Sequence, residues 1–278
     1  KKVEQALRQH QKRGTYNTIT SAEKLAATLT EQLQLETKDK HLNVQYSERP
    51  IPEQSKDQKP SAEEQAEELA GMKAQNFGVE RIERLPFNIG YLALHGFADA
   101  KVAGDTLAAT MTVLAHTDAL IIDLRRNGGG EPNAVAFIAS YLFDERTHLT
   151  DIHWREGNRI EQFWSSDHLA GTKFGQKKDV YVLTSKDTFS AAEDLSYTLQ
   201  SLKRATIVGE TTHGGAHPGD FIRLDRHFNA FVPNGRSINP ITKANWEGTG
   251  VKPDLTASAE DALKVAQTAV LKKMMAAE

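Results

Sequence analysis

The sequence predicts an α/β protein, with a layered core preceded by a helical N-terminal segment. From about residue 81 onward, apolar stretches of strand length alternate with amphipathic stretches of helix length, which is the pattern of a sheet covered by helices. Residues 119–125, ALIIDLR, are nearly all apolar, as is typical of a strand covered on both faces. We therefore place an N-terminal helical segment with a short strand and a linker at residues 1–80, and an α/β core at residues 81–278.

The N-terminal segment is predicted to alternate between helical and extended structure. Residues 21–36, SAEKLAATLTEQLQLE, place leucines near helical spacing, and Ser21 is a candidate N-cap. Residues 41–48, HLNVQYSE, alternate like a strand. The proline-rich polar stretch 49–60 is typical of a linker or long loop, and residues 61–76 are typical of an exposed helix.

In the core, each predicted element follows from its apolar spacing. The predicted strands are IGYLALHGF (89–97), ALIIDLR (119–125), DVYVLTS (179–185), ATIVGE (205–210), and the pair GDFIRLD (219–225) and HFNAFVPNG (227–235). The predicted helices are GDTLAATMTVLAHT (104–117), NAVAFIASYLFD (133–144), the segment that starts at Ser190, and AEDALKVAQTAVLKKMM (259–275).

The composition excludes several classes of protein. Of the 278 residues, 39% are hydrophobic and 26% are charged, and no apolar run is long enough for a membrane-spanning helix. The net charge is −3 with both signs interspersed, so there is no basic stripe of the kind that binds nucleic acid. The absence of cysteine excludes disulfides, thiolate metal sites and cysteine catalysis. The oligomeric state stays open.

Ser190, in the stretch KDTFSAAEDLSYTLQSL (186–202), has two possible roles. With Glu193 it fits the S-x-x-E capping box that begins a helix, and apolar residues at helical spacing follow it. A serine between a buried strand and a helix is usually a cap, so the local pattern by itself favours a structural role. A catalytic role depends on what the rest of the chain supplies.

Two glycine-rich stretches could carry chemistry. Residues 123–134, DLRRNGGGEPNA, place three glycines between a buried strand and a helix, where backbone N–H groups could bind an anion or an oxyanion. The stretch lacks the P-loop and dinucleotide-binding spacings, and a tight structural turn is the simpler interpretation. In residues 209–220, His213 and His217 are four apart but not on a helix, so we discount a metal site.

Two further residues are ambiguous when taken singly. Glu247 lies in a turn-rich stretch between Trp246 and Gly248, where a surface glutamate is the simplest interpretation. His41 stands at the entry to a predicted strand, where a lone histidine is more often structural than catalytic.

Four motifs, in order, resemble one superfamily. ALIIDLRRNGGG resembles D-L-R-x-N-x-G-G, LTSKDTFSAAEDLSYTL resembles T-S-x-x-T-x-S-A-A-E, ATIVGETTHGGA resembles V-G-E-x-T-x-G, and NWEGTGVKPDL resembles W-E-G-x-G-V-x-P-D. These are motifs of the tail-specific (C-terminal processing) and tricorn-core serine peptidases, and the last is closest to the interphotoreceptor retinoid-binding protein branch. The resemblance implies a ClpP/crotonase-like core and serine peptidase activity. The chain between the leading helices and residue 81 is too short for the PDZ domain that tail-specific peptidases insert there, so we expect no PDZ domain at this place.

One departure from the family pattern bears on the mechanism. Tail-specific peptidases use a serine–lysine dyad with the lysine in T-x-G-K, and here Gly215 stands at the lysine position. The tricorn-like alternative is a histidine early in the chain and a glutamate late in it, which match His41 and Glu247. Lys40 stands where the tricorn pattern has a serine. The resemblance therefore implies a triad of Ser190, His41 and Glu247.

The chemistry of such a triad is coherent. Histidine would act as the base for the serine, and the carboxylate would fix the imidazole tautomer. The resemblance implies an oxyanion hole built from the N–H of Ala191 and that of Gly129 or Gly130. No cofactor or metal is expected, the substrate would be a peptide or protein, and the resemblance favours a periplasmic or secreted location.

Two alternatives remain open at this stage. A catalytically silent module that binds an apolar small molecule is possible, because retinoid-binding repeats share this fold. Acyl-CoA chemistry on the related crotonase-like fold is a weaker alternative, since only Glu131 offers an acid in the glycine turn. Labelling of Ser190 by a fluorophosphonate would separate the first from a peptidase, and coenzyme A dependence would separate the second.

Overall fold

The computed structural model describes residues 2–53 and 61–277 and divides into two compact units. The N-terminal unit comprises Lys1–Pro60, Trp154–Arg159 and His217–Arg236, and the core unit comprises Ser61–His153, Ile160–Ala216 and Ser237–Glu278. The compact units differ from the predicted division at residue 80, because two later segments belong to the N-terminal unit. As a statement about domains, the 1–80 and 81–278 division stays a prediction.

The N-terminal unit contains two helices and a small antiparallel sheet. The helices are α1 (Lys2–Lys12) and α2 (Ala22–Thr37), and the strands are β1 (Asn43–Tyr46), β9 (Gly219–Arg223) and β10 (Phe228–Pro233), in the order β1-β10-β9. Ser21 caps α2 as the sequence predicts, with its side chain accepting the Lys24 N–H at 3.2 Å. Ala26 of α2, Val44 of β1 and Ala230 of β10 form the buried centre of this unit.

A six-stranded mixed sheet organises the core unit. Its strands are β2 (Val79–Leu85), β3 (Ile89–Leu94), β4 (Ala119–Asp123), β7 (Asp179–Thr184), β8 (Thr206–Gly209) and β12 (Leu255–Thr256), in the order β12-β8-β7-β4-β3-β2. All neighbouring pairs are parallel except β2 with β3, which is antiparallel. The predicted alternation of strands and helices and the α/β class are confirmed.

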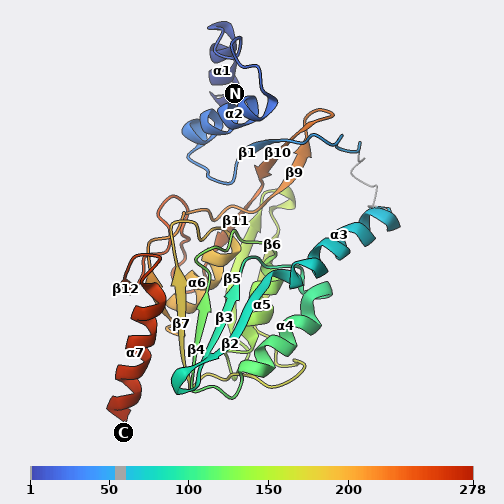
Figure 1. Cartoon of the computed structure of the whole chain (residues 1–278). Coiled ribbons are helices and arrows are strands. Elements are labelled where there is room, and N and C mark those ends of the chain that lie inside the picture. Colours follow the sequence, from blue (N-terminus) through green and yellow to red (C-terminus); the bar gives the residue numbers. More distant parts are fainter. Residues whose placement is uncertain (1, 54–60, 278) are drawn as a thin grey trace. The chain divides into compact units, whose positions relative to one another are not determined.

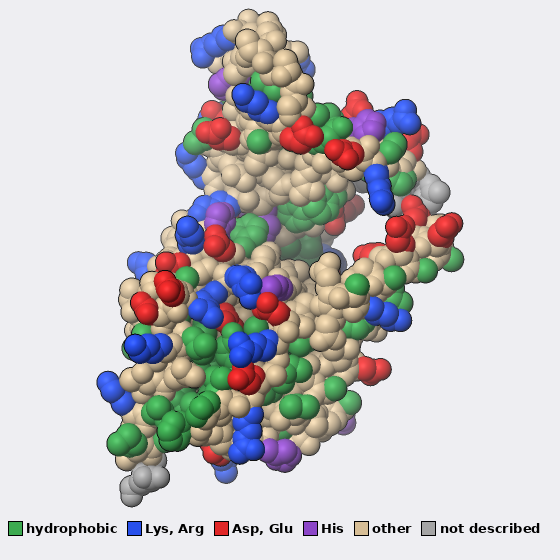
Figure 2. Space-filling view, viewed as in Figure 1, with side chains coloured by type: hydrophobic (Ala, Val, Ile, Leu, Met, Phe, Trp, Pro, Cys, Tyr) green, Lys and Arg blue, Asp and Glu red, His purple; other side chains and the backbone are tan. Residues whose placement is uncertain are grey.

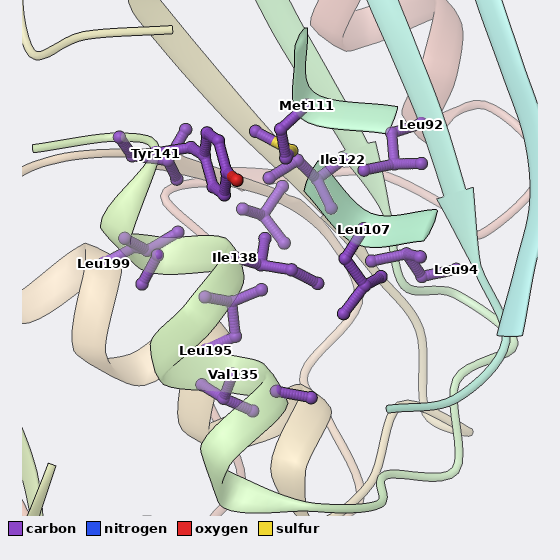
Figure 3. Packing of buried hydrophobic residues seen from close by; sticks show 14 of the residues in the cluster. Leu92, Leu94, Leu107, Met111, Ile122, Val135, Ile138, Tyr141, Leu195 and Leu199 are labelled. Atoms are coloured by element: carbon purple, nitrogen blue, oxygen red, sulfur yellow. The ribbon is translucent and has the colours of Figure 1, made fainter. Parts of the chain in front are cut away.

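Helices cover both faces of this sheet. One face packs against α4 (Ala100–Leu114), α5 (Pro132–Ser140) and α6 (Ala191–Ser201), and the other packs against α7 (Ala262–Ala277). In Figure 1, α7 lies on one side of the sheet and α4 and α5 lie on the other. Figure 3 shows the larger buried cluster, in which Leu92 and Ile122 of the sheet meet Met111, Ile138 and Leu195 of the helices. Each fully buried aliphatic side chain of this kind contributes about 1.5–3 kcal/mol.

The core unit also contains α3 (Ala62–Ala74), the 3₁₀ turns η1 (Asn76–Gly78) and η2 (Pro86–Asn88), and β6 (Ile160–Trp164). The unit boundaries fall within β5 (His148–Trp154) and within β11 (Gly235–Ile238), and η3 (Glu156–Asn158) belongs to the N-terminal unit. β5 pairs with β6 in antiparallel register. Between β1 and β2 the described residues form only α3 and η1, and the missing PDZ domain stays a prediction.

The mixture of positive and negative side chains on the surface in Figure 2 agrees with the interspersed charges of the sequence. Figure 2 shows lysine and arginine side chains interspersed with aspartate and glutamate side chains over the visible face of the core unit. Among the described residues, no helix combines the length and the apolar character that a membrane crossing needs.

Candidate active site

Ser190 sits on a strained turn between β7 and α6. Its backbone angles are φ 57° and ψ −120°, whereas an N-cap serine normally has extended angles. A positive φ is uncommon for a residue with a Cβ and costs about 1–3 kcal/mol, which the surrounding contacts must offset. Such strained residues concentrate at active sites, so the angles of Ser190 separate it from an ordinary cap.

Hydrogen bonds fix the turn before Ser190 to the glycine turn after β4. The Phe189 N–H donates to the Asn127 carbonyl at 3.0 Å, and the Thr188 hydroxyl donates to the Leu124 carbonyl at 2.8 Å. Because β4 and β7 are parallel neighbours, their carboxyl ends meet at one edge of the sheet. The two motifs that the sequence singled out are therefore joined in space.

Gly129 packs directly against Ser190. A Cβ at Gly129 would lie 2.7 Å from the Ser190 Cβ and 3.1 Å from the Ala191 nitrogen, and Gly129 has φ +107°. Only glycine can combine this backbone angle with this approach. The glycine turn and the turn of Ser190 are therefore neighbours, and the oxyanion role that the resemblance implies for the glycine turn stays a prediction.

The hydrogen bonds of the glycine turn distinguish the two candidate oxyanion donors. The Gly129 N–H donates to the Asn127 side-chain oxygen at 2.8 Å, so this donor is already used. Within the described part of the chain, neither the Gly130 N–H nor the Ala191 N–H donates a hydrogen bond to a protein group. Gly130 has φ +136°, and a Cβ there would lie 2.2 Å from the Phe97 carbonyl oxygen. Among the described residues, the N–H groups of Ala191 and Gly130 thus have no protein acceptor, whereas the Gly129 N–H is already used.

Glu193 is completely buried and accepts four hydrogen bonds. Its Oε2 accepts the Ser190 N–H at 2.9 Å, which is the glutamate half of the predicted capping box, and the Gly215 N–H at 2.9 Å. Its Oε1 accepts the Thr212 hydroxyl at 2.5 Å and the Gly214 N–H at 2.6 Å. Burial raises the pKa of Glu193, and these four hydrogen bonds oppose that rise. The sequence identified Glu193 only as a cap and missed these loop contacts.

Glu247 is held against the loop that follows β8. The Ala216 N–H donates to Glu247 Oε2 at 2.5 Å, and the Glu247 N–H donates to the Asn245 side chain at 3.1 Å. Next to it, Trp246 is 1% exposed and its Nε1 donates to the Gly215 carbonyl at 2.6 Å. These contacts give Glu247 a defined place, so it is more than the loose surface glutamate of the simplest interpretation.

His41 belongs to the N-terminal unit, where it lies between α2 and β1. The side chain is buried, and its ring centroid lies 5.8 Å from that of Phe231 on β10. The His41 N–H donates to Asp39 Oδ1 at 3.0 Å, and Asp39 Oδ2 pairs with His217 Nδ1 at 2.7 Å. Sequence reasoning missed Asp39 and its pairing with His217, because 178 positions separate the two residues.

The pKa of Asp39 reflects this environment. Burial on its own would raise the pKa, but the hydrogen bonds from His217 and from the His41 N–H, together with the nearby histidine charge, lower it below its ordinary value. Asp39 is therefore an anion at neutral pH and holds the segment that carries His41.

In this structure, Ser190, Ala191, Gly129, Gly130 and Glu247 all belong to the core unit, and His41 belongs to the N-terminal unit. The turn of Ser190 and the glycine turn are in contact, and Glu247 is connected to Ser190 through the loop at residues 212–216 and Glu193. The catalytic roles that the sequence assigns to these residues stay predictions.

Two family models match the chain. Residues 88–257, more than half of the chain, match the model of peptidase family S41. Residues 1–78 match a model described as the N-terminal domain of this family in eukaryotic IRBP.

Curated relatives match over part of their length. The chloroplastic C-terminal processing peptidase of Tetradesmus obliquus is 32% identical over 126 residues, which are 45% of this chain and 26% of that protein. The carboxyl-terminal-processing protease of Synechocystis sp. is 32% identical over 127 residues, which are 46% of this chain and 28% of that protein. The matched part is thus less than a third of each of these relatives.

Solved structures share the fold over most of the chain. A candidate peptidase from Parabacteroides merdae has a TM-score of 0.62 at 21% identity, covering 91% of this chain and 84% of that one. A lipoprotein from Streptococcus agalactiae has a TM-score of 0.61 at 15% identity, covering 97% of this chain and 88% of that one. At these identities the likeness concerns the fold alone. The match of the family model, together with the motif order and the paired serine and glycine turns, shows that this chain belongs to peptidase family S41.

Proposed function

We propose that this protein is a serine peptidase that hydrolyses peptide bonds through an acyl-enzyme on Ser190. The observation that carries the proposal is the strained backbone of Ser190 at the start of α6, packed against Gly129 and followed by the Ala191 N–H, which has no protein acceptor among the described residues. A cap does not need these angles, whereas a nucleophile exposed next to oxyanion donors does. The family relationship supports the same reaction class.

In the proposed reaction, Ser190 attacks the carbonyl carbon of the scissile peptide bond. The hydroxyl proton passes to a histidine base, which we assign to His41, and then to the leaving amine. The N–H groups of Ala191 and Gly130 stabilise the oxyanion, and the N-terminus of α6 adds a favourable potential. Glu247 orients the imidazole. Water then hydrolyses the acyl-enzyme by the same steps in reverse order.

A serine–lysine dyad is a poor fit at this site. Gly215 stands at the lysine position of the family motif, and its N–H donates to Glu193 at 2.9 Å. A glycine supplies no base, so the proposal requires the proton acceptor to come from elsewhere. A histidine suits this role because its ordinary pKa lies near neutral pH.

A second candidate function is supported by the N-terminal match. Residues 1–78 resemble the N-terminal domain found in eukaryotic IRBP, whose branch includes retinoid-binding repeats. A catalytically silent module that binds an apolar small molecule is therefore the alternative. For the acyl-CoA alternative, Glu131 is an exposed residue at the start of α5, and no observation favours that role.

A fluorophosphonate probe tests the proposal directly. Wild type should be labelled at Ser190 and should hydrolyse a peptide library, and Ser190→Ala should lose both. His41→Ala should lower turnover nearly as much as Ser190→Ala, by about four orders of magnitude, and the double variant little more. The matched control is His116→Ala, because His116 is exposed and precedes β4, at the end of that strand away from the glycine turn. No labelling of wild type, with saturable binding of an apolar ligand, would establish the alternative.

A further inference from the structure

We infer that Glu193 is a positioning residue for the proposed reaction, which holds the strained backbone of Ser190 and the loop in contact with Glu247 in one arrangement. The inference rests on the proposed function, because it gives Glu193 a part in the same reaction. It goes beyond the capping role that the sequence predicts for this residue.

The number and direction of the hydrogen bonds exceed what a helix cap needs. A capping box requires one bond from Glu193 to the Ser190 N–H, and that bond is present at 2.9 Å. The other three bonds reach residues 19 to 22 positions further along the chain. A glutamate that served only α6 would not need these distant partners.

The chemistry of the partners indicates that Glu193 acts as a carboxylate. Three partners are backbone N–H groups, which can only donate. The fourth is the Thr212 hydroxyl, whose oxygen already accepts the Val251 N–H at 2.7 Å and whose proton is therefore directed to Glu193. Both carboxylate oxygens thus face two donors each, and an amide in the same place would bring its NH₂ group against N–H donors.

The loop at residues 212–216 transmits this anchoring to Glu247. On one side, Glu193 holds Thr212, Gly214 and Gly215. On the other side, the loop contacts the turn that contains Glu247: Gly214 accepts the Gly248 N–H at 2.9 Å, Gly215 accepts the Trp246 Nε1–H at 2.6 Å, and Ala216 donates to Glu247 at 2.5 Å. The loop therefore lies between two carboxylates, one from the nucleophile helix and one from the Glu247 turn.

Glycine is required at position 214, where the loop packs closely against residues 248–250. Gly214 has φ +93°, and a Cβ there would lie 2.9 Å from the Gly250 nitrogen. The close packing means that the loop cannot adjust independently of its anchors. If Glu193 releases the loop, the Ala216 N–H and its partner Glu247 move with it.

Loss of the Glu193 carboxylate should therefore misplace two groups at once. The Ser190 backbone would lose the acceptor that holds its N–H and could relax toward ordinary angles, which would move the hydroxyl and the Ala191 N–H. A displacement of about 1 Å in such a constellation can cost about 100-fold in rate. Because the displaced hydroxyl and N–H act on the reacting atoms, the loss should fall on kcat rather than on KM.

The test compares Glu193→Gln with Asp194→Asn. Both changes replace a buried carboxyl by its amide on adjacent residues of α6, but Asp194 contacts Thr198 and not the loop. Well below both melting temperatures, Glu193→Gln should label with the fluorophosphonate about 100-fold more slowly than wild type, with kcat lowered by the same factor and KM unchanged. Asp194→Asn should label near the wild-type rate. A purely structural role would lower the melting temperature and leave the rate per folded molecule unchanged.

The outcomes separate this inference from the proposed function. If wild type and folded Glu193→Gln are labelled at the same rate, the inference about Glu193 is wrong and the proposed peptidase function stands. Wild type not labelled would remove both. If Glu193→Gln does not fold, Thr212→Val and Thr212→Ser decide, because only the serine keeps a hydroxyl for Glu193. The inference is supported if Thr212→Val is labelled more slowly than wild type and Thr212→Ser is not. It is contradicted if both variants are labelled at the wild-type rate.

Discussion

At the scale of single residues, Ser190 combines a helix start with a backbone conformation that its sequence pattern does not predict. The S-x-x-E pattern locates the beginning of α6 correctly, and the Glu193 bond to the Ser190 N–H is the one expected. The φ of 57° depends on Gly129 and on the loop at residues 212–216, which are distant in sequence. Local patterns therefore give the position of the site, and the strain follows only from tertiary contacts.

The strain at Ser190 can be measured by comparing two inactive variants. Ser190→Ala keeps the Cβ and the strain, whereas Ser190→Gly can adopt a positive φ without steric cost. Release of about 1–3 kcal/mol of strain should outweigh the extra entropy that glycine loses on folding, about 0.5–1 kcal/mol. Urea unfolding should therefore show Ser190→Gly to be the more stable variant by about 1 kcal/mol. An alanine variant of equal or greater stability would show that Ser190 is unstrained.

The glycine turn offers a matched pair of substitutions. Gly129→Ala places a methyl group 2.7 Å from the Ser190 Cβ at φ +107°, so it should displace Ser190 and strain the turn. Gly128→Ala meets no atom within 4 Å and should be tolerated. We expect Gly129→Ala to slow fluorophosphonate labelling by about 100-fold or more, and Gly128→Ala to label near the wild-type rate. Equal labelling of the two variants would show that the approach of Gly129 to Ser190 has no part in the reaction.

At the scale of elements, the predicted helices and central strands are present, and the errors fall where local periodicity is weak. The helix predicted at 104–117 begins earlier, at Ala100, because Asp99 caps it through the Lys101 N–H. Strand β2 was not predicted: it is an edge strand whose residues are mostly polar and exposed. The β5–β6 pair was also missed, since its strands carry mixed polar and aromatic residues without a clear alternation.

Helix α6 contains a second buried acid that should make stability depend on pH. Burial raises the pKa of Asp194 from its ordinary 3.8 to about 7, although the Thr198 hydroxyl, at 3.3 Å, favours the charged form. The folded protein thus retains a proton that the unfolded chain has already lost. The stability from this group is complete below pH 3.8 and is lost as the pH rises to about 7, at about 1.4 kcal/mol per pH unit.

Asp194→Asn should remove this dependence. Between about pH 5 and about pH 8, the stability of wild type should fall by about 3 kcal/mol relative to the variant. Urea unfolding of both proteins at the two pH values measures this difference, and the comparison cancels the titration of all other groups. Parallel stability curves would show that Asp194 is ionised in the folded state at both pH values.

At the scale of the whole molecule, the order of motifs along the chain predicts more than any one of them. Four separate motifs, taken in order, indicated the family, and the family model that matches residues 88–257 confirms it. The compact units were not predictable in the same way. Residues 43–46 pair with residues 228–231, so a late hairpin joins the N-terminal unit, and no local pattern encodes that pairing.

The lysines of the chain provide a test of the mechanism at this largest scale. Since Gly215 occupies the lysine position of the family dyad, no lysine should be needed as a base. Changing any single lysine to alanine is expected to leave kcat/KM within about tenfold of wild type, because loss of a general base costs about 100-fold or more. Lys40 should show the largest effect, since it directly precedes His41 in the chain. A scan of all lysines, with the melting temperature of each variant as the control, measures this directly. A stably folded variant without turnover at any other lysine would mean that a lysine is the base and that the assignment to His41 is wrong.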